Sequence, residues 1–404
     1  MRSNLRIAVT GLAATYPFGG VFWDYIQYVL GLHRLGHDVL YIEDTGQWCY
    51  SPRQHTYIED GADNAAHLDE HLRRLEPDLA GRWFFRDATG RCFGRSWQQV
   101  CQFCRDADML LHISASCWLR DEYLAARRLV FLDSDPMYTQ ASFPDVEAGT
   151  ADADTAARVA KLQQHDVFFT FALNMDGADC RVPPGPMTWH PTRQPVVLDC
   201  FTPLPLDARR RVLTTVASWE PREDGPTVAG VRYAGKSVEF LRMIDLPARS
   251  PVPLELAMGG PAPVKRLASH GWRVQPALEV SGDPWVYRDY LARSFGEWSV
   301  AKQAYAAGRT GWFSTRTACY LALGVPAVVQ DTGFSHIIPT GEGVLTFSNT
   351  DEAAAAIESL CSDPQRHARS ARQIAETYFA SDRVLMNMLD QALASEPATG
   401  SSHP

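Results

Sequence analysis

Residues 311–333 read "GWFSTRTACYLALGVPAVVQDTG", and this stretch decides the fold class of the 404-residue chain. The short apolar runs near its two ends are typical of buried strands, and the segment between them has the pattern of a helix. A run of hydroxyls with one arginine, at 314–317, therefore stands where a strand leads into a helix. In open α/β sheets, ligands bind at such junctions, beyond the carboxyl ends of strands. We expect a ligand site here.

The chemistry of this junction suits a phosphate. Ser314 or Thr315 can cap the helix, and the free N–H groups of its first turn carry partial positive charge that favours an anionic oxygen. Arg316 adds a fixed cation able to form paired bonds to phosphate. The alternative is that the hydroxyls only cap the helix and that Arg316 lies in solvent. Ser314, Thr315 and Arg316 are thus candidate ligand-binding residues.

The strand-to-helix pattern recurs along the chain. Residues 5–12 form an apolar, β-prone run, a loop with glycines follows, and the next segment has helical spacing until Gly36, before another strand at 38–44. Strand, helix and strand in this order predict a parallel sheet. Further strands are expected at 107–115, 127–135, 165–172, 212–219, 254–259, 309–315, 326–331 and 343–347. The prolines of residues 191–211 are typical of a linker, so two consecutive parallel α/β domains are predicted.

Composition and charge narrow the class of protein. Hydrophobic residues make up 46% and charged residues 21%, as in a soluble globular protein. The formal net charge of −9 argues against a nucleic-acid partner. No apolar stretch reaches the roughly 18–20 residues of a membrane span, and the N-terminus is more typical of a first strand than of a signal peptide. We expect a cytoplasmic protein without a membrane span.

The cysteines do not indicate a metal or redox centre. Nine of them are spread from Cys49 to Cys361 without the spacing of a disulfide framework, so most are expected to be reduced. Cys101 and Cys104 form one CxxC on a helical pattern, but neither a second pair nor a nearby histidine completes a zinc site. Metal ligands are therefore predicted to be absent.

A longer stretch carries a family resemblance. Residues 320–365, "YLALGVPAVVQDTGFSHIIPTGEGVLTFSNTDEAAAAIESLCSDPQ", resemble the C-terminal domain of GT-B glycosyltransferases, particularly the retaining family 4 enzymes. The resemblance lies in the helix ending in a GxP motif, the glycine-bearing loop after the next strand, the GxGxLxF strand and the final helix pair. It covers about residues 212–394. It implies the GT-B fold, in which two Rossmann-like parallel-sheet domains face a central cleft.

The resemblance also implies that each domain binds a different substrate. An N-terminal Rossmann-like domain at 1–200 would bind the acceptor, and a C-terminal Rossmann-like domain at 201–381 would bind the nucleotide sugar. A helix at 382–394 would pack back on the N-terminal domain, and the tail at 395–404 is expected to be disordered. Three features depart from the family 4 pattern: Cys319 replaces a ribose-binding glutamate, residues 311–314 read GWFS in place of EPFG, and His336 replaces the glutamate of the following loop. These changes concern the nucleotide contact.

Similarity to the family suggests cations for the donor diphosphate. "GVRYAGKSVEFL" at 230–241 resembles the segment whose arginine and lysine neutralise that diphosphate, so Arg232 and Lys236 are predicted catalytic groups. They would stabilise the charge that develops on the leaving nucleoside diphosphate. The alternative is a solvated pair of charges in a surface loop.

Further donor contacts are expected on either side of the opening stretch. Glu297 could bind the ribose hydroxyls and Lys302 the diphosphate, although a solvated helix face is an alternative for both. Asp331, Thr332 and Gly333 end a strand that points toward the same cleft, and in GT-B enzymes this loop often touches the donor sugar. A simple Asx turn is the alternative for Asp331.

The first domain offers its own candidates. Gly19 and Gly20 allow a close backbone approach to the donor across the cleft, because neither has a Cβ. Asp24 follows one helical turn later and could be the base of an inverting reaction. An aspartate that only favours a helix start is an equally good interpretation.

Three residues are candidates for binding the acceptor. Asp133 and Asp135 end a predicted strand, where their alternate positions point to opposite faces, so one of them could contact an acceptor hydroxyl. His112 could also face the cleft, although a hydrogen-bonded core histidine is the alternative.

The resulting hypothesis is a metal-independent glycosyltransferase that moves a sugar from a nucleotide-sugar donor to a hydroxyl of a small molecule or glycan, with natural-product biosynthesis as one setting. The nucleotide-diphosphate sugar is a co-substrate, no cofactor is expected, and the protein would be a monomer or homodimer. The alternatives are a catalytically inactive GT-B scaffold and a nucleotide-sugar epimerase. A binding protein of the periplasmic type is disfavoured by the lack of an export signal.

Overall fold

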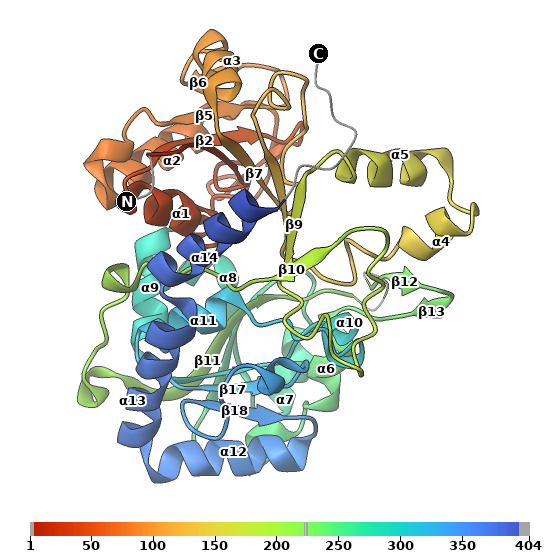
Figure 1. Cartoon of the computed structure of the whole chain (residues 1–404). Coiled ribbons are helices and arrows are strands. Elements are labelled where there is room, and N and C mark those ends of the chain that lie inside the picture. Colours follow the sequence, from red (N-terminus) through yellow and green to blue (C-terminus); the bar gives the residue numbers. More distant parts are fainter. Residues whose placement is uncertain (1–3, 222, 224, 396–404) are drawn as a thin grey trace.

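The computed structural model describes residues 4–221, 223 and 225–395, and it contains two large sheets (Figure 1). The N-terminal half forms an eight-stranded sheet in the order β10-β9-β8-β7-β1-β2-β5-β6. All neighbouring strands in it are parallel except β5 and β6. The strands are β1 (Arg6–Thr10), β2 (Asp38–Asp44), β5 (Trp83–Arg86), β6 (Cys92–Gly94), β7 (Met109–Ile113), β8 (Leu129–Asp133), β9 (Val167–Thr170) and β10 (Trp189–Pro191).

The C-terminal half forms a six-stranded parallel sheet in the order β15-β14-β11-β16-β17-β18. Its strands are β11 (Arg210–Ser218), β14 (Leu254–Gly259), β15 (Arg273–Pro276), β16 (Ser294–Ser299), β17 (Ala327–Gln330) and β18 (Val344–Phe347). The third, second, first, fourth, fifth and sixth strands follow one another across this sheet, which is the Rossmann order. Chain order reverses between β11 and β16, and ligands of such sheets bind at that point.

Helices cover both sheets, so the central strands are buried along their whole length. All five residues of β8 are buried, for example, and so are all six of β16. The helices of the N-terminal half are α1 (Gly19–Arg34), α2 (Ala62–Leu75), α3 (Trp97–Asp106), α4 (Phe143–Glu147) and α5 (Ala153–Leu162). Those of the C-terminal half are α6 (Lys236–Arg242), α7 (Val264–Ser269), α8 (Ala277–Ser281), α9 (Pro284–Ala292), α10 (Gln303–Ala307), α11 (Thr315–Ala322), α12 (Thr350–Ser362), α13 (Pro364–Ile374) and α14 (Ser381–Ala394).

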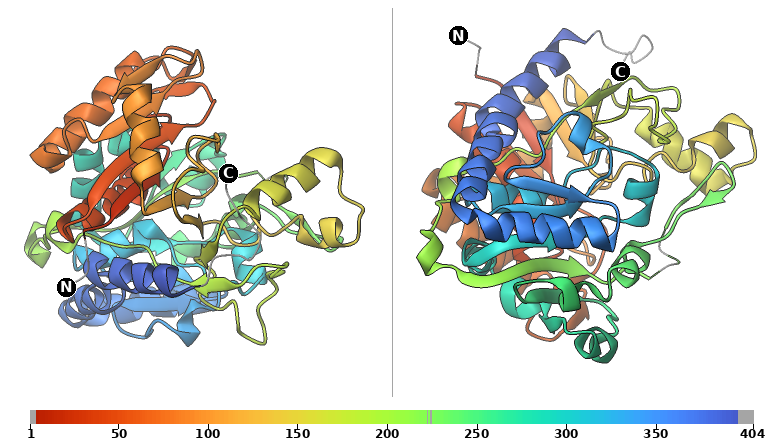
Figure 2. Two further views of the ribbon diagram at one scale, coloured as in Figure 1. Left: turned by 45° about the horizontal axis from the view of Figure 1, so that its top comes forward. Right: turned by 90° about the horizontal axis from the view of Figure 1, so that it is seen from below.

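Two small hairpins complete the fold. The first pairs β3 (Cys49–Ser51) with β4 (Thr56–Ile58), and the second pairs β12 (Thr227–Val228) with β13 (Val231–Arg232). The β12–β13 hairpin projects from the same side of the molecule as α4 and α5 (Figures 1 and 2). Two Rossmann-like parallel-sheet domains are thus confirmed as the fold class.

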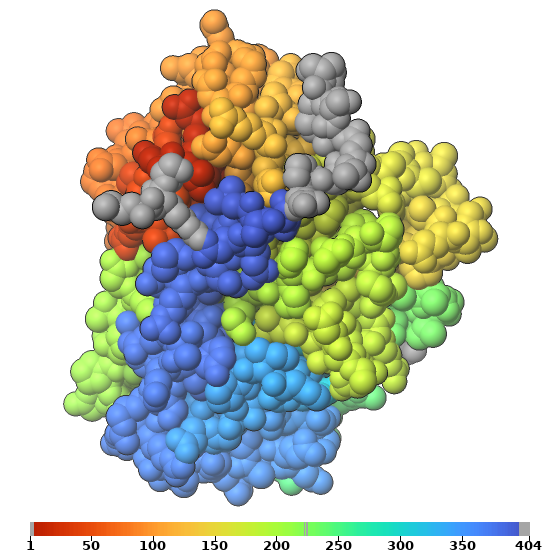
Figure 3. All heavy atoms as spheres, in the orientation of Figure 1, coloured from red at the N-terminus to blue at the C-terminus, as the bar shows by residue number. Residues whose placement is uncertain are grey.

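The two halves share one hydrophobic core. Helix α1 packs against α9 of the C-terminal half, and the indole of Trp23 donates a hydrogen bond of 2.9 Å to the Pro284 carbonyl. After α13, a π-helical turn at Ala375–Phe379 leads into α14, which returns to pack on α1. The space-filling view shows this C-terminal segment running up from the lower half to the upper half (Figure 3). One continuous cluster of buried side chains therefore spans both sheets.

The strand predicted at 309–315 is wrong. These residues form a loop, because Arg309 and Gly311 adopt positive φ values of 49° and 78° that interrupt an extended chain. The neighbouring strand of the sheet is β16, further upstream, so Glu297 lies inside a buried strand rather than on a helix face. The structure also places α2, the β3–β4 hairpin, β5 and β6 in the aromatic-rich stretch 44–100, where no elements were predicted.

The predicted tail begins at residue 395, and its positions 396–404 lie outside the described residues. Among the described helices, none combines the length and the apolar character that crossing a membrane requires.

The return of α14 to α1 should contribute strongly to stability. Leu385 is fully buried on α14, where it fills the space beside Gly31 of α1. We expect Leu385→Ala to lower the free energy of unfolding by about 2–5 kcal/mol, through lost burial and the cavity left behind. Leu393→Ala is the matched control on the same helix, because that side chain is 45% exposed. Equal effects of the two changes in urea unfolding would contradict this packing.

Candidate active site in the cleft between the sheets

A cleft of about 710 Å³ lies between the two halves. Its N-terminal wall consists of the start of α1, the β3–β4 hairpin and the loops that follow β8 and β9. Its C-terminal wall consists of the ends of β11 and β14 and the first residues of α6, α8 and α11. Both sheets therefore present the carboxyl ends of their strands to one space, which is where α/β folds bind ligands.

Helix α11 points its amino end into this cleft. Ser314 is the N-cap residue, yet its side chain makes no capping hydrogen bond, and the first turn contains no acidic residue. The N-terminal amides of a helix carry partial positive charge and suit an anion. Ser314 and Thr315 both line the cleft, so their predicted position at a helix terminus facing a ligand space matches the structure.

Lys236 is the least neutralised cation in the cleft. It begins α6, is only 9% exposed, and forms no ion pair with any residue in the described part of the chain. Burial lowers its pKa to about 8, with further lowering by the nearby charges of Arg316 and Lys302, whereas Glu220 acts in the opposite direction. Below that pH the buried ammonium is charged and lacks a paired anion, so an anionic ligand would stabilise it.

Lys302 bridges the two halves. Its Nζ lies 2.9 Å from Oδ1 of Asp135, and the Tyr305 hydroxyl donates to the same carboxylate. Burial disfavours the charged forms of both groups, but their mutual attraction outweighs it, raising the pKa of Lys302 and lowering the pKa of Asp135. Both predicted site residues thus line the cleft, where they hold the two walls together.

Arg316 lines the cleft, and its guanidinium is anchored to the C-terminal sheet. Its Nε donates to Glu297 at 2.7 Å, one terminal nitrogen to the Val216 carbonyl at 2.7 Å and the other to Ser299 Oγ at 2.6 Å. Burial would lower its pKa, but the Glu297 carboxylate more than compensates and raises it. These bonds use one N–H of each nitrogen, and a guanidinium has five N–H donors, so the phosphate contact of Arg316 stays a prediction.

Glu297 is likewise not positioned for a ribose. Its side chain is fully buried beside Arg316, and its second carboxylate oxygen has no hydrogen-bond partner among the described residues. It does not line the cleft. Its role in this structure is to fix Arg316, and through it the start of α11, to β16.

Asp24 faces α11 from the opposite wall. It lies on α1, its side chain is open to the cleft, and it makes a hydrogen bond with the hydroxyl of Thr315. Desolvation deep in the cleft raises its pKa to about 6; the Thr315 hydrogen bond opposes this, and Asp135 adds to it. A carboxylate with that pKa is mostly ionised at neutral pH and can still take up a proton, as a general base requires.

Several predicted residues lie elsewhere. Arg232 is exposed on the projecting β12–β13 hairpin and does not line the cleft. His112 is buried between His165 and the Cys117 carbonyl, and burial lowers its pKa to about 3. Asp133 is also buried, where hydroxyl and amide groups satisfy it and burial raises its pKa. Their positions do not support contact with a diphosphate or an acceptor.

Of the remaining predicted residues, one lines the cleft and the others do not. Gly20 lines the cleft, but Gly19 is covered by α9, where a Cβ would come within 2.5 Å of Tyr287. Asp331 binds Arg309 at 2.9 Å and accepts from the N–H of Gly333. Asp331 and its two successors do not line the cleft.

Sequence reasoning missed other cleft residues. Glu220 and Gly259–Gly260 lie on the C-terminal wall, and Phe18, Tyr50 and Tyr57 lie on the N-terminal wall. The glycine pair follows a correctly predicted strand, so its place at a carboxyl end was an available signal. The tyrosines carried no such signal, because their hairpin lies in a stretch without a clear periodicity.

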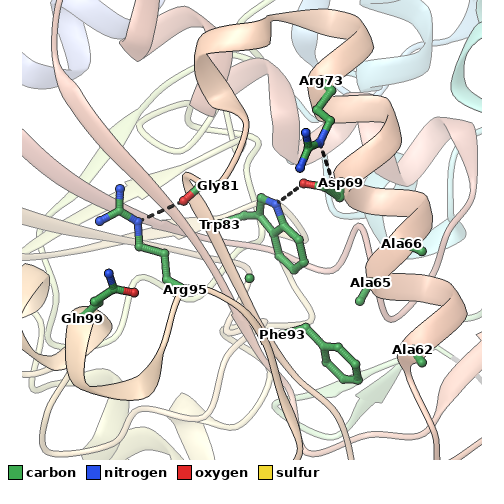
Figure 4. A pocket seen from close by; sticks show the side chains of 11 residues that line it. Ala62, Ala65, Ala66, Asp69, Arg73, Gly81, Trp83, Phe93, Arg95 and Gln99 are labelled. Carbon is green, nitrogen blue, oxygen red and sulfur yellow. Dashed lines mark hydrogen bonds and ion pairs between the residues drawn. The ribbon is translucent and has the colours of Figure 1, made fainter.

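A second hollow of about 650 Å³ lies on the outer edge of the N-terminal half, between α2 and β5–β6 (Figure 4). Its polar groups already bind one another. Asp69 accepts from both Arg73 and the Trp83 indole, and Arg95 donates to the Gly81 carbonyl. Nothing in it resembles the charged arrangement of the cleft.

No group of three or more His, Cys, Asp or Glu side chains able to hold a metal occurs among residues 4–221, 223 and 225–395. Metal independence of the reaction stays a prediction. The CxxC cysteines, Cys101 and Cys104, are free thiols buried on α3.

Solved structures of similar fold are numerous, whereas no protein-family profile matches the sequence and no curated protein is significantly similar to it. AviGT4, a glycosyltransferase involved in avilamycin A biosynthesis, matches with a TM-score of 0.51 and 13% identity over 96% of this chain and 97% of that one. An alpha-glucosyltransferase in complex with UDP matches with a TM-score of 0.57 and 9% identity over 96% and 100%.

Alr3699/HepE from Anabaena, in complex with UDP and glucose, matches with a TM-score of 0.54 and 12% identity over 97% of this chain and 100% of that one. At such identities the likeness establishes the fold. The chain has the two-domain fold of GT-B glycosyltransferases over nearly its whole length.

The buried pair of Arg316 and Glu297 should be indispensable to the second sheet. Glu297→Gln would leave a buried guanidinium without its counter-charge, and we expect the free energy of unfolding to fall by about 3 kcal/mol or more. Glu342→Gln removes the partner of Arg366 in an exposed pair and should change stability little. Urea unfolding of both variants checks this, and a Glu297→Gln protein as stable as Glu342→Gln would refute the structural role.

Proposed function

We propose that this protein is a glycosyltransferase that takes a sugar from a nucleotide-diphosphate donor. Uridine diphosphate is the first nucleotide to test, because two of the similar structures contain UDP. The observation that carries the proposal is the pairing of an unneutralised buried Lys236 with the uncapped start of α11 in one cleft. The similarity of residues 320–365 to the retaining family 4 enzymes supports an alternative version of this proposal, in which the anomeric configuration is retained.

The reaction would proceed across the cleft. The bond from the sugar anomeric carbon to the donor phosphate oxygen breaks, and a bond from that carbon to the acceptor hydroxyl oxygen forms. The departing nucleoside diphosphate gains negative charge, which Lys236, Lys302 and the amides of α11 would stabilise. Lys302 would interact with the diphosphate while keeping its ion pair with Asp135. Activity in the presence of EDTA would test whether these groups suffice without a metal.

Asp24 is the group we propose to accept the proton of the acceptor hydroxyl. It is the cleft carboxylate of the N-terminal wall whose pKa lies nearest neutrality, at about 6. A base at this position suits inversion of the anomeric centre. Retention, which the family 4 resemblance implies, would not require a base. The transfer rate of a variant that lacks the Asp24 carboxylate therefore distinguishes inversion from retention.

Nucleotide binding should depend on Lys236. We expect UDP to raise the melting temperature of the wild-type protein and Lys236→Met to abolish most of that shift. The wild-type shift should also shrink above pH 8, because the ammonium loses its proton there. Lys265→Met, at an exposed position on α7, is the matched control. An unchanged shift in Lys236→Met would remove this residue from the site.

Transfer should require the ionised form of Asp24. We expect kcat/KM of the wild type to fall as the pH drops through about 6, because protonation blocks the base. Asp24→Asn should lower the rate by about 10²–10⁴-fold while keeping the UDP-induced thermal shift. A variant with wild-type rate and a flat profile near pH 6 would favour retention without a base. A wild-type protein that neither hydrolyses nor transfers would indicate an inactive scaffold.

A further inference from the structure

The N-terminal side of the cleft carries an aromatic surface that the proposed reaction does not use. Phe18, Tyr50 and Tyr57 all line the cleft, and we call them the aromatic wall. Tyr50 and Tyr57 are direct partners across the β3–β4 hairpin, with ring centroids 5.5 Å apart in a T-shaped arrangement. The ring of Phe18 lies 5.0 Å from that of Tyr50. The three rings form one continuous patch.

Hydrogen bonds hold the hairpin in place. The N–H of Tyr50 donates to the Thr15 carbonyl at 2.9 Å. The amide of Asn64, which is only 3% exposed, donates to the carbonyls of both Ala14 and Tyr50, at 2.7 and 3.0 Å. The wall is therefore attached to the loop between β1 and α1 and is part of the folded domain.

The wall lies beside the reacting groups. Phe18 directly precedes α1, whose second turn carries Asp24, and Gly20 and Val21 line the cleft between them. Tyr57 is 52% exposed, so much of its ring remains open. Covering an aromatic face with another apolar surface is favourable. A molecule lying on the wall would have one edge near Asp24.

The chemistry of the wall favours a particular ligand. Within 45–61, all of which the structure describes, Tyr50 and Tyr57 are the only residues that line the cleft. The nearby Tyr16 hydroxyl already donates to Gln47 at 2.7 Å. The polar groups of the wall are the hydroxyls of Tyr50 and Tyr57, which are fewer than the many hydroxyls of a saccharide need as partners. A planar ring would instead bury apolar area on the three rings.

Building on the proposed function, we propose that the aromatic wall is the acceptor subsite and that the acceptor is a planar aromatic compound bearing a hydroxyl. This subsite replaces His112 and Asp133 as the predicted place of the acceptor. Specificity would come from stacking on Tyr50 and Tyr57, and the hydroxyl would be presented to Asp24.

Binding and transfer with defined probes test this proposal. We use 4-methylumbelliferone as the planar phenol and methyl β-glucoside as the saccharide. Binding is measured by titration calorimetry with UDP present, and transfer by product mass with UDP-glucose as the sugar donor. Tyr57→Ala should weaken binding of the phenol about tenfold, the loss of one stacking partner. It should leave the UDP-induced thermal shift unchanged, and the rate at which water replaces the acceptor in cleaving UDP-glucose should equal that of the wild type.

Trp48→Ala is the matched control, because Trp48 is also 52% exposed, lies in the same segment and does not line the cleft. Its phenol affinity should equal that of the wild type. Binding of the saccharide in preference to the phenol, or equal phenol affinity in Tyr57→Ala and wild type, would overturn the acceptor assignment while leaving donor binding intact. Absence of any UDP-induced shift and of donor hydrolysis would instead overturn the proposed function, and the acceptor assignment with it.

Discussion

The buried ion pair between Arg316 and Glu297 is the constraint on which the cleft depends. It ties the start of α11 to β16 and, through the Val216 carbonyl, to the end of β11. These are the two strands between which chain order reverses. Anchored in this way, the guanidinium fixes the N-terminus of α11 at the carboxyl edge of the sheet, beside the cleft. The residue predicted as a ligand contact thus also has a structural role.

Ion pairs join the two halves of the molecule. Asp135 of the N-terminal half binds Lys302 of the C-terminal half, and Arg309 joins Asp179 on one side to Asp331 on the other. Together with the shared core around α1 they hold two charged surfaces face to face. This arrangement leaves Lys236 without a partner carboxylate within the described structure and gives Asp24 a pKa suited to proton transfer.

Strands and long helices were predictable where their periodicity was strong. β2 was expected at 38–44 and β14 at 254–259, and the structure has both at those positions. The loop at 309–313 and strand β16 were not predictable in this way. An apolar run has the same pattern in a strand and in a loop that is packed in a core. Strand β16 was missed because it contains the charged residue Glu297, whose partner Arg316 comes from a different segment of the chain.

The sequence by itself determined the succession of strands and helices, and with it the parallel sheets and the residues at strand ends, because these depend on local periodicity and turn chemistry. It also placed Ser314, Thr315, Lys236 and Asp24 at positions that reach the cleft. Tertiary structure alone decided which charges are neutralised and which remain open, as with Arg316 and Lys236. Whether a charge is neutralised depends on partner residues that folding brings together from distant parts of the chain, and a local sequence pattern does not identify these partners.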